Sequence, residues 1–138
     1  MILLSLALLS LLWMTTYSNR ESMDSYYELI SFSLVKEPIE VFRTFGYEWV
    51  KEYESHPISR FPTGSQVISA RTTLDQYPFD SELFEREISI DPDDTVQNGI
   101  RARRVVVKVR PVAQSRPEAW LRKNEVTLEA LIFEGPRM

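Results

Sequence analysis

Residues 1–14 are apolar except for Ser5 and Ser10, and no charged side chain occurs before Arg20. This run is shorter than the roughly 20 apolar residues that cross the hydrocarbon layer of a bilayer. It also differs from a secretory signal, because no basic residue opens it and no small-residue cleavage pattern follows Trp13. We therefore divide the chain into an apolar helical segment, residues 1–17, and a single globular domain, residues 18–138.

From Thr15 to about Ser55, apolar side chains recur at spacings of three and four residues, which is typical of a helix that buries one face. We expect this helix to continue directly from the apolar segment. Pro38 predicts a kink or a break, because proline lacks the amide donor and crowds the preceding turn. Gly46 is a second weak point. The apolar positions are Met23, Tyr26, Tyr27, Ile30, Leu34, Val35, Val41, Phe42, Phe45, Trp49, Val50 and Tyr53.

After Pro62 the pattern changes from helical spacing to alternation, which indicates strands. Strands are predicted at residues 66–73, 84–90, 102–110 and 125–134. Residues 91–99 supply turn chemistry, and Asn98-Gly99 is a strong hairpin signal. A helix followed by strands, without alternation of the two, predicts the α+β class. We expect the long helix to pack on a small antiparallel sheet of three to four strands.

Composition excludes several kinds of chemistry. The 138 residues include no Cys, one His (His56) and four Gly, which leaves no thiolate chemistry and little basis for a histidine relay or a glycine-rich nucleotide loop. We expect neither enzymatic activity nor a cofactor. The aromatic side chains along the helix are expected to fill its core with the sheet. They are Tyr26, Tyr27, Phe32, Phe42, Phe45, Tyr47, Trp49 and Tyr53.

Charge is distributed unevenly. Residues 101–138 hold nine basic and four acidic side chains, whereas residues 1–100 hold seven and sixteen. Three interpretations of the basic strand remain open: a solvated sheet edge, a contact with an acidic neighbouring subunit, or a nucleic-acid stripe. We do not expect nucleic-acid binding, because no aromatic side chain in the strand could stack on a base. The five cations are Arg101, Arg103, Arg104, Lys108 and Arg110.

Asp91, Asp93 and Asp94 form an acidic cluster ahead of Asn98-Gly99. Clustered carboxylates suit Ca²⁺, but their spacing does not match an EF-hand loop. Pro92 and Asn98-Gly99 instead indicate turns. We expect a turn here and no metal site, with these three aspartates as weak calcium candidates.

The order of these elements resembles the type IV pilin-like proteins, which include minor pilins and pseudopilins. The resemblance rests on the apolar residues 1–14 that run into the amphipathic residues 15–55, and on the pairing of residues 100–110 with residues 125–134. It implies a structural subunit of a type IV pilus-like or type II secretion pseudopilus-like filament, with other pilin-like subunits as partners. The implied membrane and assembly residues are Ile2, Leu3, Leu4, Leu6, Leu8, Leu9, Leu11, Leu12 and Trp13.

The resemblance also implies a location: a single-pass anchor in the bacterial inner membrane, with the globular domain in the periplasm, outside the cell or in a filament. The family's cleavage motif, a glycine followed by a short stretch ending in glutamate, is absent, since this chain has Ser5 and no acid before Glu21. A prefix of about six to eight residues upstream of Met1 would supply the motif and bring the apolar run to about 20. The alternative is a membrane-anchored envelope domain that binds a ligand or protein and never polymerises.

Overall fold

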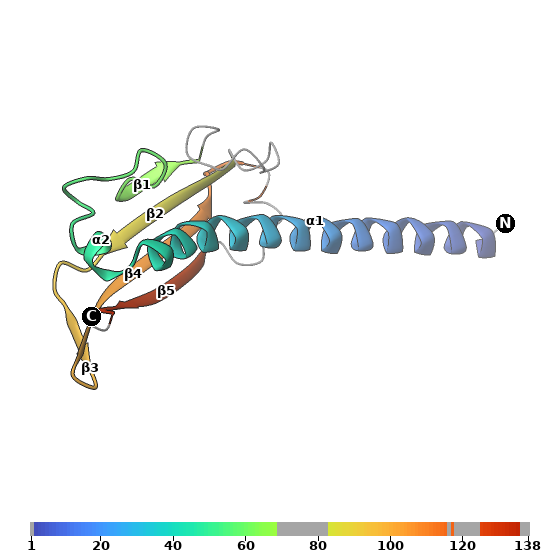
Figure 1. Cartoon of the computed structure of the whole chain (residues 1–138). Coiled ribbons are helices and arrows are strands. Elements are labelled where there is room, and N and C mark those ends of the chain that lie inside the picture. Colours follow the sequence, from blue (N-terminus) through green and yellow to red (C-terminus); the bar gives the residue numbers. More distant parts are fainter. Residues whose placement is uncertain (1, 69–82, 116, 118–124, 136–138) are drawn as a thin grey trace.

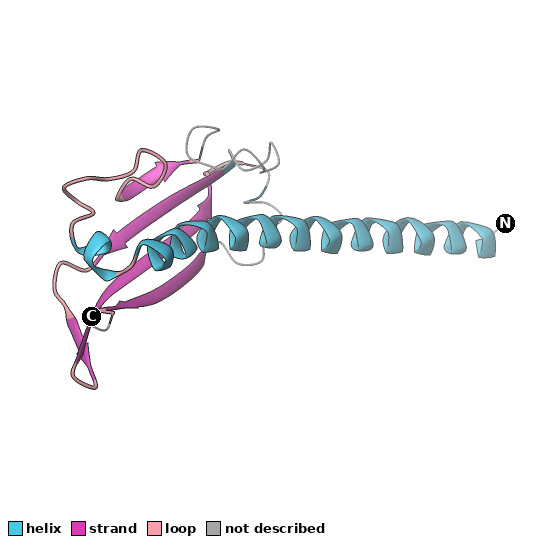
Figure 2. Cartoon of the chain, in the orientation of Figure 1, coloured by secondary structure: helices cyan, strands magenta, loops and turns pink. Residues whose placement is uncertain are grey.

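The computed structural model describes residues 2–68, 83–115, 117 and 125–135. A long helix, α1 (Ile2–Phe45), lies across one face of an antiparallel sheet and extends well beyond it toward the N-terminus (Figure 1). Its 44 residues correspond to about 65 Å at 1.5 Å per residue. A short second helix, α2 (Tyr47–Lys51), follows directly. The α+β class is therefore confirmed, with helices and strands in separate parts of the chain (Figure 2).

The sheet has five strands, one more than the upper expected number. They are β1 (Gly64–Val67), β2 (Phe84–Ile90), β3 (Thr95–Gln97), β4 (Ile100–Pro111) and β5 (Val126–Phe133). Strand β4 is central: it pairs with β2 and β3 along one side and with β5 along the other, while β1 pairs with β2. The additional strand, β3, lies in the segment for which the sequence predicts only turns. Of the first predicted strand, residues 69–73 lie outside the described residues.

Alternation along the strands gives the sheet one apolar face. Val105, Val107 and Val109 of β4 are buried, as are Ala130 and Ile132 of β5, which pair with Val105 and Arg103 respectively. The register places all of these side chains on the same face, toward α1. The helix contributes Tyr27, Ile30, Leu34, Ile39 and Phe42, among others, to this core. Each large apolar side chain that is fully buried there stabilises the fold by about 1.5–3 kcal/mol.

Helix α1 continues through Pro38, so the expected break at this residue is wrong. It ends instead at Phe45, because Gly46 adopts φ +83°, a conformation that favours glycine. Helix α2 follows, and Tyr53, just beyond it, is buried in the core. The Tyr53 hydroxyl donates a hydrogen bond to the Phe61 carbonyl (2.6 Å) and accepts one from the Ile58 amide (3.2 Å). Tyr53 thereby fixes the loop that leads to β1.

A charged pair is buried between α1 and the sheet. Arg86 of β2 lies on the apolar face, and its guanidinium is 3.1 Å from the Glu37 carboxylate on α1. Both side chains are 4% exposed. The guanidinium also lies over the Phe61 ring, 4.9 Å from its centroid. Buried charges are tolerated where they are paired and hydrogen bonded, and this pair fixes the position of the helix relative to β2.

Candidate assembly interface

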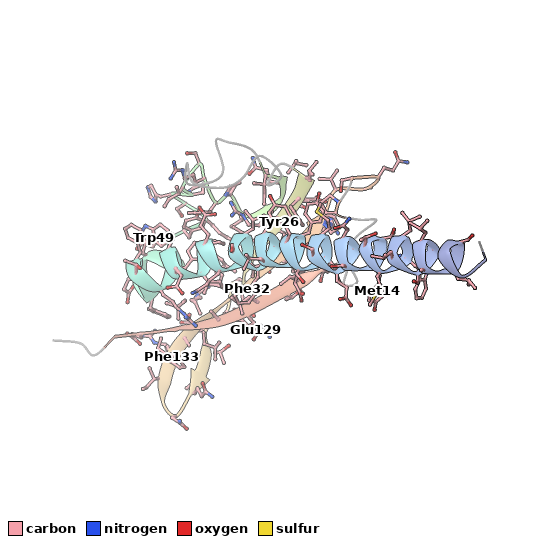
Figure 3. All side chains as sticks on the ribbon, turned by 90° about the vertical axis from the view of Figure 1, so that its right-hand side faces the viewer. Met14, Tyr26, Phe32, Trp49, Glu129 and Phe133 are labelled. Atoms are coloured by element: carbon pink, nitrogen blue, oxygen red, sulfur yellow. The ribbon has the colours of Figure 1, made fainter. Side chains whose placement is uncertain are left out.

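The first part of α1 is apolar up to Met14, and none of its described side chains before Met23 belongs to the domain's core cluster. All side chains from Ser5 to Ser22 are exposed, and the core begins at Met23 and Tyr27. Large apolar residues in this stretch range from 55% exposed at Leu8 to 77% at Trp13. Figure 3 shows Met14 on this exposed part of the helix. The exposed large residues are Leu6, Leu8, Leu9, Leu11, Leu12, Trp13, Met14 and Tyr17.

The sequence forms a helix here for local reasons. Leucine has a high helix propensity, and no Gly or Pro occurs before Pro38. Hydroxyl groups are accommodated by bonding back to the helix: Thr16 donates to the Leu12 carbonyl (2.8 Å), and Ser10 donates to the Ala7 carbonyl (2.9 Å). A helix that is apolar all round is normally buried in a larger core. This surface is therefore the part of the described chain that most needs a covering partner.

The expected membrane anchor is contradicted. No helix among the described residues combines the length and the apolar content needed to cross a bilayer. The apolar run gives way to the polar residues Thr15, Thr16, Ser18 and Asn19, followed by Arg20 and Glu21. The location in the bacterial inner membrane that the resemblance implies is accordingly withdrawn. Among the implied membrane residues, Leu6, Leu8, Leu9, Leu11, Leu12 and Trp13 are exposed, whereas the side chains of Ile2, Leu3 and Leu4 lie outside the described ones.

A hollow of about 580 Å³ lies along the same part of α1. Its described lining residues all belong to this one helix: Trp13, Met14, Thr15, Tyr17, Ser18, Asn19 and Glu21. Along α1, the hollow therefore coincides with the exposed part of the helix described above.

The basic strand is β4, and its position at the centre of the sheet rules out the interpretation as a solvated edge. Its arginines pair within the chain. Arg101 makes a bidentate contact with Glu134 (3.0 and 3.1 Å), and Arg110 lies 3.0 Å from Glu85. These hydrogen-bonded partners raise the pKa of both arginines, and Arg110 together with Ser65 lowers the pKa of Glu85.

Two further arginines of β4 are paired in the same way. Arg103 binds Asp94 (2.7 Å), and Arg104 lies 3.0 Å from Glu129 on β5. Lys108 is paired in register with Glu87 on β2 and makes no ion pair with another described residue. Four of the five cations are thus neutralised by acids of the same chain. This leaves little free charge on β4 for an acidic subunit or for nucleic acid.

The three aspartates do not converge on one point. Asp94 accepts a hydrogen bond from the Tyr47 hydroxyl (2.6 Å) through one oxygen and from Arg103 through the other. The Tyr47 bond is the main cause of the lowered pKa of Asp94, and Arg103 adds to it. Asp91 is 3.7 Å from Arg104. No group of three or more potential ligands is found among the described residues, and the structure uses Asp94 to join α2 to β4.

Some aromatic side chains of α1 that the sequence predicts to lie in the core are exposed. Phe32, expected in the core, is exposed on the side of α1 that faces away from the sheet, together with Leu29. Helical spacing contains the signal: Phe32 is two residues from both Ile30 and Leu34, about 200° around the helix from each. Phe45 is also exposed, and its ring stacks on Trp49 (4.6 Å between centroids). Tyr26 is partly exposed beside Leu29.

Comparison with models of known protein families, with curated proteins and with solved structures finds no match for this chain.

Proposed function

We propose that this chain is a structural subunit of a filament of the type IV pilus-like or type II secretion pseudopilus-like kind. In this proposal, the apolar half of α1 is covered by the helices of other copies, and the globular domain lies around that helical core. The interface repeats from head to tail, since it joins two different surfaces of the same chain. The function is structural: each added copy lengthens the filament and contributes one folded domain around its helical core.

One observation carries the proposal: eight large apolar side chains between Leu6 and Tyr17 are more than half exposed on a helix that extends away from its own core. Leaving such residues in water is costly, at about 25 cal/mol for each Å² of apolar surface. Exposed apolar patches of this extent mark interaction surfaces. A second copy has a helix of the same composition, so packing one helix against the other removes apolar surface of both chains from water.

Removing residues 1–17 tests the proposal. The truncated domain retains every core residue, because the core begins at Met23 and Tyr27. Sedimentation velocity and negative-stain electron microscopy would be compared for the full chain and residues 18–138 over a range of concentrations. We expect long assemblies of the full chain and a folded monomer after truncation. A full chain that stays monomeric at every concentration, or a truncated chain that still assembles, would contradict the proposal.

A further inference from the structure

The hairpin that joins β3 to β4 projects beyond the rest of the sheet, on the side away from the N-terminal end of α1 (Figure 1). Its turn consists of Asn98 and Gly99, since Gln97 and Ile100 form the last pair of the ladder. Both turn residues are exposed and adopt positive φ (53° and 78°). Asn-Gly suits such a turn. The same dipeptide also places an amide nitrogen without a neighbouring side chain next to an asparagine carboxamide.

The amide nitrogen of Gly99 is accessible. It donates no hydrogen bond to any described residue. Apart from its two chain neighbours, no atom of the described chain lies within 4 Å of the point where a Cβ on Gly99 would sit. Glycine itself brings no Cβ that would hinder an attack on the preceding residue. The Gly99 nitrogen therefore meets no steric barrier to the side-chain carbonyl carbon, Cγ, of Asn98.

Little opposes the loosening of the turn that brings these two atoms together. Strand β3 has three residues, all exposed, and it is joined to β4 by three residue pairs. Local opening costs least at exposed ends of this kind. Asn19 differs, because it lies inside α1, where the amide of Arg20 belongs to the helical hydrogen-bond ladder. The third asparagine, Asn124, lies outside the described residues.

We propose that Asn98 is a site of spontaneous covalent modification, at which the chain converts asparagine to aspartate and isoaspartate through a succinimide. The Gly99 nitrogen bonds to Cγ of Asn98. The bond from Cγ to the side-chain nitrogen breaks, and ammonia leaves with the proton that the Gly99 amide gives up. Water then adds to either carbonyl carbon of the ring and reopens it. The reaction consumes water and releases ammonia, without oxidation or reduction.

The two products affect the hairpin differently. Aspartate keeps the turn, because Asp-Gly also favours it. In isoaspartate the main chain runs through Cβ and Cγ of residue 98 and is longer by one carbon, so the Gln97–Ile100 pair no longer closes. Asp94, which Tyr47 and Arg103 both bind, limits this release to the hairpin. No member of the core cluster lies in residues 91–104, so the modification opens β3 and leaves the core intact.

Peptide mass mapping of the full chain, incubated at mildly alkaline pH to favour loss of the Gly99 amide proton, tests the site. Cleavage after Arg86 and Arg101 isolates residues 87–101, in which Asn98 is the sole asparagine. We expect this peptide to gain the mass difference between O and NH, with isoaspartate and aspartate distinguished by electron-transfer fragmentation. Conversion at Asn98 is expected to be roughly tenfold or more faster than at Asn19 in the same sample.

The matched control is Asn98→Gly, because Gly-Gly also forms this turn. Its peptide should show no mass gain. Isoaspartate distinguishes attack by the Gly99 nitrogen from direct hydrolysis of the side-chain amide, which yields aspartate alone. No conversion at Asn98, aspartate without isoaspartate, equal conversion at Asn19, or the same mass gain in the control would overturn the proposal.

Hydrogen exchange on the isoaspartate form supplies a second readout. We expect protection to be lost at the amides of Gln97 and Ile100. Protection should be unchanged at Ile88 and Val107, which pair in the ladder between β2 and β4. Retained protection at Ile100 would overturn the proposed opening of β3, and loss at Val107 would overturn its confinement to the hairpin.

Discussion

Arg86 donates a hydrogen bond to the carbonyl oxygen of Leu34 (3.4 Å), the one that Pro38 leaves without its helical partner. In an α-helix the amide of residue 38 would bond to the carbonyl of residue 34, but proline has no amide hydrogen. The guanidinium replaces that donor from the neighbouring strand while it pairs with Glu37. This explains how α1 remains continuous through Pro38 at the place where it crosses the sheet.

Replacing Arg86 by Met should therefore increase the loss in the free energy of unfolding that Pro38 causes. In the Arg86→Met background, Pro38→Ala restores an amide donor to a carbonyl that has lost its guanidinium partner. We expect Pro38→Ala to stabilise this background by about 1 kcal/mol more than it stabilises the wild type, which is the order of the cost of an unsatisfied buried acceptor. Urea unfolding of the four chains in this double-mutant cycle measures the coupling. Equal effects in both backgrounds would contradict the explanation.

Removing the carboxylate partner should be strongly destabilising. Glu37→Ala leaves the Arg86 charge at a site only 4% exposed, and we expect it to lower the free energy of unfolding by about 3–5 kcal/mol. Glu40→Ala on the same helix is a suitable control, because its contact with Lys36 is exposed and worth less than about 1 kcal/mol. A loss at Glu37 no larger than at Glu40 would show that the buried pair does not hold α1 on the sheet.

The hydroxyl of Tyr53 should matter apart from its ring. Tyr53→Phe keeps the edge-on contact with Phe42 (5.0 Å) but removes the bonds to the Phe61 carbonyl and the Ile58 amide. We expect a loss of about 1–3 kcal/mol, from buried groups left without a partner. Hydrogen exchange should locate the change in residues 54–62. Unchanged protection of the Ile58 amide would be inconsistent with this role.

Asp94 should make the stability of the fold depend on pH in the acidic range. Its pKa is lowered in the folded chain, mainly by the Tyr47 hydroxyl and further by Arg103, so the stabilisation is present above the ordinary pKa of an aspartate. It is lost as the pH falls through the lowered value. Asp94→Asn is expected to be less stable than the wild type at pH 6, with the difference shrinking below about pH 4. A difference that stays constant from pH 6 to pH 2 would exclude this contribution.

Much of the fold follows from periodicity. The long helix, strands β2, β4 and β5, and the hairpin at Asn98-Gly99 all appear in the sequence pattern, and both turn residues adopt positive φ (53° and 78°). Strand β3 does not appear in the sequence pattern, because its three residues are too few to show alternation. The continuity of α1 at Pro38 could not be predicted either, since it depends on Arg86, which reaches the helix from a strand far along the sequence.

Less of the candidate assembly interface could be predicted from the sequence. The pattern identifies residues 1–14 as apolar, but the exposure of Phe32 depends on which side of α1 meets the sheet. The cations of β4 look free in the sequence because their partners, among them Glu85, Glu129 and Glu134, are distant along the chain or lie on other strands. Sheet topology therefore determines how the basic strand is neutralised, and helix orientation determines which aromatic residues are buried.

The most direct test of the account compares two substitutions at equal exposure. Leu12 on the exposed first part of α1 and Val96 on β3 are both 66% exposed, and each would be replaced by Glu in the full chain. Burying a leucine in an interface contributes about 1.5–3 kcal/mol, so Leu12→Glu should raise the critical concentration for assembly more than tenfold in sedimentation experiments. Val96→Glu should leave it unchanged. Equal assembly of both variants and the wild type would contradict a filament built on α1.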